Sequence, residues 1–231
     1  MSFSFMLTGI VSLFILVVSL ILVWVFFVDK TYLWDLQENE KHRLQRKELP
    51  RSDCDPPVLF QSHPGCCPQK VCAVDHYPFF IRSGVANMVG PKICFNNSII
   101  MGGIMNNIGQ GLNIVVVKGE TGEILKSNYF NAHTGELLEF LKSIQAGNIV
   151  CVASYEDPAE VLTDEIREIF IRLGSTMSRS VKRRDTWVFV GAEGIVKESP
   201  FEKLSANDEK SNVYGGWPEM REVGGCFPRK I

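Results

Sequence analysis

The sequence predicts an α/β or α+β sandwich, in which short strands pair locally and helices pack on them. Short apolar runs rich in β-branched and aromatic residues, bounded by Gly or Asn, alternate with segments whose apolar residues have a helical spacing. Hydrophobic residues make up 45% of the 231 positions and charged residues 22%, as in a globular chain with a core. About 165 residues remain for this fold once the N-terminal segments are set aside, which corresponds to one domain.

An apolar segment opens the chain. Residues 6 to 28 contain no charge and as a helix would span about 35 Å, enough to cross a bilayer core of about 30 Å. The segment runs into Asp29 without an A-x-A cleavage motif, so a signal-anchor is favoured over a cleaved signal peptide, and a buried core helix is the third alternative. We therefore expect residues 1–28 to be a signal-anchor or signal peptide.

A polar stem follows the apolar segment. Residues 29–65 mix charges of both signs, contain four prolines and show little apolar periodicity, although a short helix is compatible with Trp34 to Leu44. The folded domain is expected to occupy residues 66–231.

Two signals disagree about the side of the membrane on which the domain lies. Lys30, Lys41 and Arg43 follow the apolar segment, which by the positive-inside rule places the domain in the cytosol. All seven cysteines also follow it, and Asn96-Asn97-Ser98 is an acceptor site for N-glycosylation. We give the cysteines more weight and expect the domain in the lumen of the secretory pathway or outside the cell.

The domain's strands and helices follow in order. Five strands are expected, at residues 79–81, 112–117, 123–130, 148–153 and 186–191. The turn sequence Lys118-Gly119-Glu120-Thr121-Gly122 makes residues 112–130 a hairpin. One helix is expected near residues 135–146 and another after Thr163, its N-cap, with acidic residues in the first turn and an end at Gly174.

Charge and motifs exclude several functions. The formal net charge is only −2 and the basic residues are scattered, so nucleic acid is not an expected partner. No His-Glu-x-x-His site, Walker lysine or Gly-x-Ser-x-Gly elbow occurs, and Gly109-Gln110-Gly111 lacks the third glycine of a dinucleotide loop. Glu156 and Asp157 follow a predicted strand and could serve acid–base catalysis, but a structural turn before Pro158 is the favoured interpretation. We expect no metal, no cofactor and no enzymatic activity.

The cysteines favour disulfides over metal binding. Only Cys67 and Cys72 come near the spacing of a metal-binding pair, and no second pair completes four ligands. Two disulfides that tie the chain ends to the sheet fit better. Cys151 lies inside an apolar strand and is expected to be a buried free thiol, while the odd total leaves at least one cysteine unpaired or available for a disulfide-linked dimer.

Several stretches between residues 66 and 228 resemble the secreted cytokine-like family of pancreatic-derived factor and interleukin-like EMT inducer. They are Gly90-Pro91-Lys92-Ile93-Cys94, Arg184-Asp185-Thr186-Trp187-Val188-Phe189, Ser199-Pro200-Phe201-Glu202, Gly216-Trp217-Pro218-Glu219 and Gly225-Cys226-Phe227-Pro228. The resemblance implies a globular β-β-α sandwich with two disulfides, Cys66 with Cys94 and Cys72 with Cys226. Cys67 adjoins Cys66, so the first pairing is left open; Cys54, Cys67 and Cys151 lie outside the family's pattern.

The chain is also similar to the GG-type lectin module, which occurs in the stem of a Golgi enzyme that extends O-mannosyl glycans. That resemblance implies that Gln110, Glu156 and Arg184 face a sugar. Gln110 stands where the module has arginine, and Glu156 is longer than its usual aspartate. Trp187 is either an apolar wall of the sugar site or a core residue of its strand, and Arg184-Asp185 is either part of that site or a structural pair.

These resemblances imply a non-enzymatic, cytokine- or hormone-like signalling protein that binds a cell-surface receptor. A carbohydrate-binding module, or a glycosylation accessory in the Golgi lumen, is the alternative. The protein is expected to be secreted, or to stay in the secretory pathway as a single-pass type II membrane protein.

Overall fold

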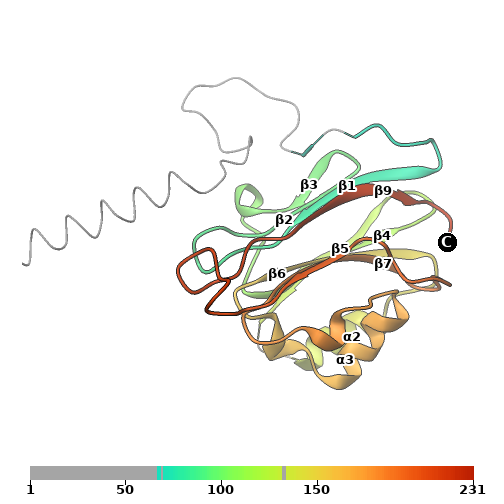
Figure 1. The fold of residues 1–231 in the computed structure, drawn as a ribbon. Coiled ribbons are helices and arrows are strands. Elements are labelled where there is room, and N and C mark those ends of the chain that lie inside the picture. The colour runs from blue at the N-terminus through green and yellow to red at the C-terminus, as the bar shows by residue number, and fades with distance from the viewer. Residues whose placement is uncertain (1–66, 69, 132–133) are drawn as a thin grey trace, which may run out of the picture. The chain divides into compact units, whose positions relative to one another are not determined.

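Two β-sheets and one helical layer make up the part of the chain that the computed structural model describes, residues 67–68, 70–131 and 134–231 (Figure 1). The expected signal-anchor and stem lie outside these residues, as do Cys54 and Cys66. Within the described residues, no helix is both long and apolar enough to cross a membrane.

The first sheet has the strand order β3-β2-β1-β9, and each neighbouring pair is antiparallel. Its strands are β1 (His76–Arg82), β2 (Lys92–Phe95), β3 (Ser98–Met101) and β9 (Glu222–Pro228). The sequence predicted only part of β1. The other strands were missed because β2 and β3 have four residues each and β9 contains two glycines and a proline, which have low strand propensity.

The second sheet has the order β5-β4-β6-β7-β8, again antiparallel throughout. Its strands are β4 (Gly111–Lys118), β5 (Ile124–Phe130), β6 (Asn148–Tyr155), β7 (Thr186–Ala192) and β8 (Glu202–Ser205). The four strands predicted here and the hairpin of β4 with β5 are confirmed, whereas β8 was not predicted.

Helices cover one face of the second sheet (Figure 1). They are α2 (Thr134–Lys142) and α3 (Asp164–Arg172), with 3₁₀ turns η1 (Gly103–Met105), η2 (Pro158–Val161) and η3 (Ser178–Ser180) between other elements. Thr163 caps α3 as predicted, because its Oγ1 accepts a hydrogen bond from the Ile166 amide at 3.3 Å.

Both faces of the second sheet are buried, which makes it the middle of three layers. In β4, Ile114 and Val116 pack against the helices, while Val115 and Val117 pack against the first sheet. Alternate residues of a strand point to opposite faces, so such a strand is an unbroken apolar run. The layers are therefore β, β and α, and the predicted β-β-α sandwich is confirmed.

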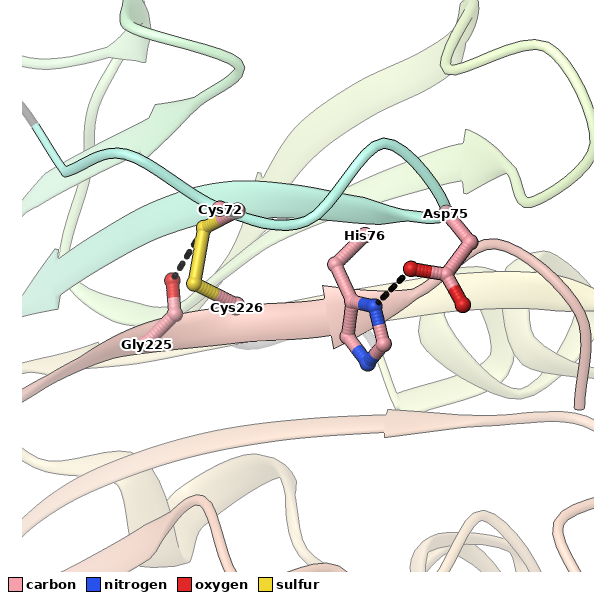
Figure 2. The surroundings of a disulfide bond; sticks show 5 residues. All are labelled: Cys72, Asp75, His76, Gly225 and Cys226. Atoms are coloured by element: carbon pink, nitrogen blue, oxygen red, sulfur yellow. Dashed lines mark hydrogen bonds and ion pairs between the residues drawn. A yellow bond between two sulfur atoms is a disulfide. The ribbon is translucent and has the colours of Figure 1, made fainter.

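Two disulfides fasten the segment before β1 to the outer face of the first sheet. Cys67 bonds Cys94 of β2, and Cys72 bonds Cys226 of β9 (Figure 2). The second pair is the one that the resemblance implied. The first differs by one residue from the expected bond of Cys66 with Cys94, because Cys67 makes the bond and Cys66 lies outside the described residues.

A hydrogen bond between two neighbouring side chains lies at the end of this segment, beside the second disulfide. His76 Nδ1 lies 2.7 Å from Asp75 Oδ1 (Figure 2), and this hydrogen bond lowers the pKa of Asp75.

Candidate functional site

Three strand ends of the second sheet meet at one end of the sandwich. Gly111, the first residue of β4, pairs with Tyr155, the last residue of β6. β7 runs antiparallel to β6 and therefore starts at the same end. Gln110, Glu156 and Arg184, which precede β4, follow β6 and precede β7, are thereby brought to one edge although they are far apart in the sequence.

Gln110 and Glu156 contact each other directly. The Gln110 side-chain Nε2 donates to Glu156 Oε2 at 2.7 Å, and Gln110 is exposed. Glu156 has a left-handed backbone with φ of 58°, which turns its side chain out of the direction of β6. Burial, and secondly the charge of Glu156, raise the pKa of the neighbouring Tyr155.

Asp157 holds the local backbone together. Its Oδ1 accepts from the Ala159 amide at 3.1 Å, which caps η2, and from the Arg184 amide at 3.2 Å. Its Oδ2 lies 3.4 Å from Arg183 Nε. The Glu156 and Asp157 carboxylates are thus engaged with an amide side chain, two backbone amides and a guanidinium, an arrangement that fits the structural interpretation of the pair.

Arg184 is exposed and lies against an aromatic side chain that the sequence analysis did not place at the site. Its φ is 62°, and its guanidinium carbon lies 5.0 Å from the ring centroid of the half-buried Trp217. The turn that presents Trp217 is tight: Gly215 and Gly216 have φ of 53° and 98°, and the Trp217 amide donates to the Tyr214 carbonyl at 3.1 Å. The Gly-Gly pair between two aromatic residues is the sequence signal that could have identified this turn.

Trp187 lies away from this surface. It is fully buried, stacks on Phe189 with centroids 5.8 Å apart, and meets the edge of Phe170 at 5.1 Å. The alternative that Trp187 forms a wall of the sugar site is therefore wrong, because the alternation along β7 turns it toward the helices. Trp217 is the tryptophan that lies beside Arg184.

Asp185 has a structural role of its own. It is buried, and its two carboxylate oxygens accept from the backbone amides of Lys182 and Asn207, each at 2.7 Å. These bonds tie the turn before β7 to the loop after β8. Across the described ranges, no three His, Cys, Asp or Glu side chains gather as metal ligands would.

The expected glycosylation site lies on a hairpin turn of the first sheet. Asn96 and Asn97 connect β2 to β3 with φ of 49° and 62°, and both are exposed. An oligosaccharide could be attached here without disturbing the core, and glycosylation of Asn96 stays a prediction.

Comparison with known proteins gives consistent matches. Residues 110–195, which include Gln110, Glu156 and Arg184, match the family model described as interleukin-like EMT inducer. Protein FAM3C of Danio rerio is 46% identical over 168 residues, covering 71% of this chain and 74% of the relative. Protein FAM3D of Mus musculus is 43% identical over 169 residues, 72% of this chain and 76% of the relative. Protein FAM3A of Mus musculus is 43% identical over 162 residues, 69% and 70%.

Proposed function

Since the chain belongs to the FAM3 family of interleukin-like EMT inducers, we propose that it is a secreted, cytokine-like protein that signals by binding a cell-surface receptor and not by catalysis. The observation that carries the receptor contact is the Arg184–Trp217 pair at the end of the sandwich. Arginine and tryptophan are the residues most enriched among those that dominate protein interfaces. Here both are presented by short turns on a rigid scaffold, so little conformational freedom is lost on binding.

The proposal that the protein is not an enzyme rests on the engagement of the site's acids. Glu156 accepts from Gln110, and Asp157 accepts from two backbone amides. These carboxylates hold local structure, which supports a binding surface over an acid–base pair.

The test is saturable binding of the labelled, secreted protein to responsive cells. We expect Arg184→Ala and Trp217→Ala each to weaken binding by about tenfold or more. Arg172→Ala is the matched control. Arg172 is also an exposed arginine, but it lies on α3 in the helical layer and pairs with Glu193. Binding that is unchanged in both site variants would show that this surface does not contact the receptor.

Carbohydrate binding is the second candidate, and the assembly of Gln110, Glu156 and Arg184 at one edge favours it. A hydroxyl or acetamido group would compete with Gln110 for Glu156, and Arg184 would supply a planar set of donors. Glycan-array binding that disappears with Arg184→Ala supports this function. Receptor binding that survives the same substitution would separate the two candidates.

The route of export is part of the proposal. A cleaved N-terminus gives a secreted protein, whereas retention of residues 6–28 gives an anchored type II form in the secretory pathway. Mass spectrometry of protein from cells and from medium distinguishes the two. The same spectra, without reductant, reveal a disulfide-linked dimer if one forms.

A further inference from the structure

Two basic residues lie side by side at one end of the first sheet. Arg82, the last residue of β1, pairs in register with Lys92 of β2 on one side and with Glu222 of β9 on the other. The preceding residue, Ile81, packs between the sheets. By strand alternation, Arg82 and its two neighbours face the outer surface of the sandwich.

Both cations are nine-tenths buried, with 9% of each residue exposed. The Arg82 Nε is fully covered and has no hydrogen-bond partner. Within the described part of the chain, neither Arg82 nor Lys92 forms an ion pair or a side-chain hydrogen bond, and Glu222, although opposite Arg82, is exposed and pairs with neither.

Burying two adjacent cations without an acceptor among the described residues costs free energy for two reasons. The Arg82 Nε–H loses its hydration without a compensating bond, and the two cations repel each other in a medium that screens charge poorly. Arginine and lysine are rarely this buried unless they are paired. A bound anion beside the outer nitrogens of Arg82 and the ammonium of Lys92 would neutralise the excess charge and remove the repulsion.

We propose that Arg82 and Lys92 form a binding site for a small oxyanion, either a carboxylate or a sulfate. With Glu222 beside them, the row carries a net charge of about +1 at neutral pH, which attracts an anion. The planar guanidinium suits two oxygens of one group, and the lysine adds a point charge.

The position of this pair connects it with the rest of the same end. The chain leaves Arg82 through Ser83, and the Gly84 amide donates to the Ser154 carbonyl at 2.8 Å, two residues before Glu156. Tyr214, on the turn that carries Trp217, lies within electrostatic range of Arg82 and Glu222. An acidic group held by Arg82 and Lys92 therefore lies on the end of the sandwich that carries the candidate site, but the inference does not depend on the proposed receptor or glycan.

The test is equilibrium dialysis of radiolabelled sulfate against the protein isolated from cells that express the full-length chain. We expect saturable binding of one ion per chain, which Arg82→Gln and Lys92→Gln each weaken by about tenfold. Lys118→Gln is the matched control, because Lys118 is an exposed lysine at the other end of β4. Competition by glucuronate, acetate and neutral glucose then identifies the source: preference for glucuronate over acetate indicates a sugar acid, and equal competition indicates a free anion.

A stability measurement gives an independent readout. Sulfate should raise the thermal midpoint of the wild-type protein and of Lys118→Gln, but not that of Arg82→Met, whose apolar side chain needs no partner. If Arg82→Gln does not fold, Lys92→Gln decides the binding arm alone. The proposal is overturned if the wild-type protein binds neither sulfate nor glucuronate saturably, or if the Lys92→Gln protein binds as tightly as the wild type.

Discussion

The indole Nε1 of Trp187 donates to Oε1 of Glu202 at 2.8 Å, on the face of the second sheet that packs against the helices. The buried Glu202 carboxylate accepts four further hydrogen bonds from the loop after α3. The donors are Ser175 Oγ at 2.5 Å, the Thr176 amide at 2.7 Å, Thr176 Oγ1 at 3.0 Å and the Met177 amide at 3.2 Å. One side chain thus joins β7, β8 and the end of the helical layer.

We expect Glu202→Ala to lower the free energy of unfolding by about 3 kcal/mol, since it leaves several buried donors without an acceptor. Glu202→Gln should cost less, because its amide oxygen still accepts while its NH₂ group opposes some of the donors. Urea unfolding followed by tryptophan fluorescence measures both. The exposed Glu209→Gln is the control and should change stability by less than about 0.5 kcal/mol; a similarly small effect of Glu202→Ala would contradict the network.

The choice between adjacent cysteines gives a second prediction. Cys67→Ser should remove the bond to Cys94, whereas Cys66→Ser should leave it intact. Peptide mapping of the unreduced protein by mass spectrometry identifies the bonds in both variants. A peptide that links Cys66 to Cys94 in the wild-type protein would refute the pairing described here.

The sequence predicts a strand well when the strand's own residues show the pattern, and poorly when the strand forms because of its pairing partner. β4, β6 and β7 are buried on both faces, so their own residues form long apolar runs that identify them. β9 is different: Gly224, Gly225 and Pro228 have low strand propensity, and the strand forms because it pairs with β1 along all seven residues. That pairing is tertiary information, absent from the local pattern.

The residues of the candidate site also differ in whether the sequence alone could identify them. Gln110, Glu156 and Arg184 could be grouped by resemblance, because they flank recognisable strands. Trp217 could not, because it reaches Arg184 only through the path of the loop between β8 and β9. Trp187 lies in an apolar run, which left its role open between core and sugar wall; the burial of every residue of β7 in the structure decides for the core.

Cys151 provides a third prediction. The thiol lies between the sheets, beside Val115 of β4 and Val190 of β7, and burial raises its pKa from 9.0 to about 12. Iodoacetamide reacts with the thiolate, so we expect the peptide containing Cys151 to stay unmodified in the native protein at pH 9 and to react in urea. Equal labelling in the two conditions would show that the thiol is accessible.

The same pKa shift predicts how the free energy of unfolding changes with pH. The unfolded thiol loses its proton near pH 9 and the folded one only near 12, so above pH 9 the unfolded state binds fewer protons and stability falls. The contribution is fully present below pH 9 and decreases by about 1.4 kcal/mol per pH unit above it. Urea unfolding of the wild-type protein and Cys151→Ala in parallel isolates it, because the difference between the two should change with this slope. A difference that is independent of pH would contradict the shift.

The hairpin turn that joins β2 to β3 gives a fifth prediction, because its two positions separate glycosylation from folding. The sequence contains a single Asn-x-Ser/Thr triplet, at residues 96–98, and both turn asparagines have positive φ. Ser98→Ala removes the hydroxyl that glycosylation requires and keeps the turn. Asn97→Gly keeps the acceptor triplet and places glycine, which adopts a positive φ most readily, in the turn.

After treatment with an N-glycosidase, the wild-type and Asn97→Gly proteins should shift in electrophoretic mobility, and Ser98→Ala should not. The free energies of unfolding of the deglycosylated forms should lie within about 0.5 kcal/mol of one another. A wild-type protein that never shifts would overturn the predicted N-glycosylation of Asn96. A Ser98→Ala protein that still shifts would place the glycan elsewhere than on Asn96.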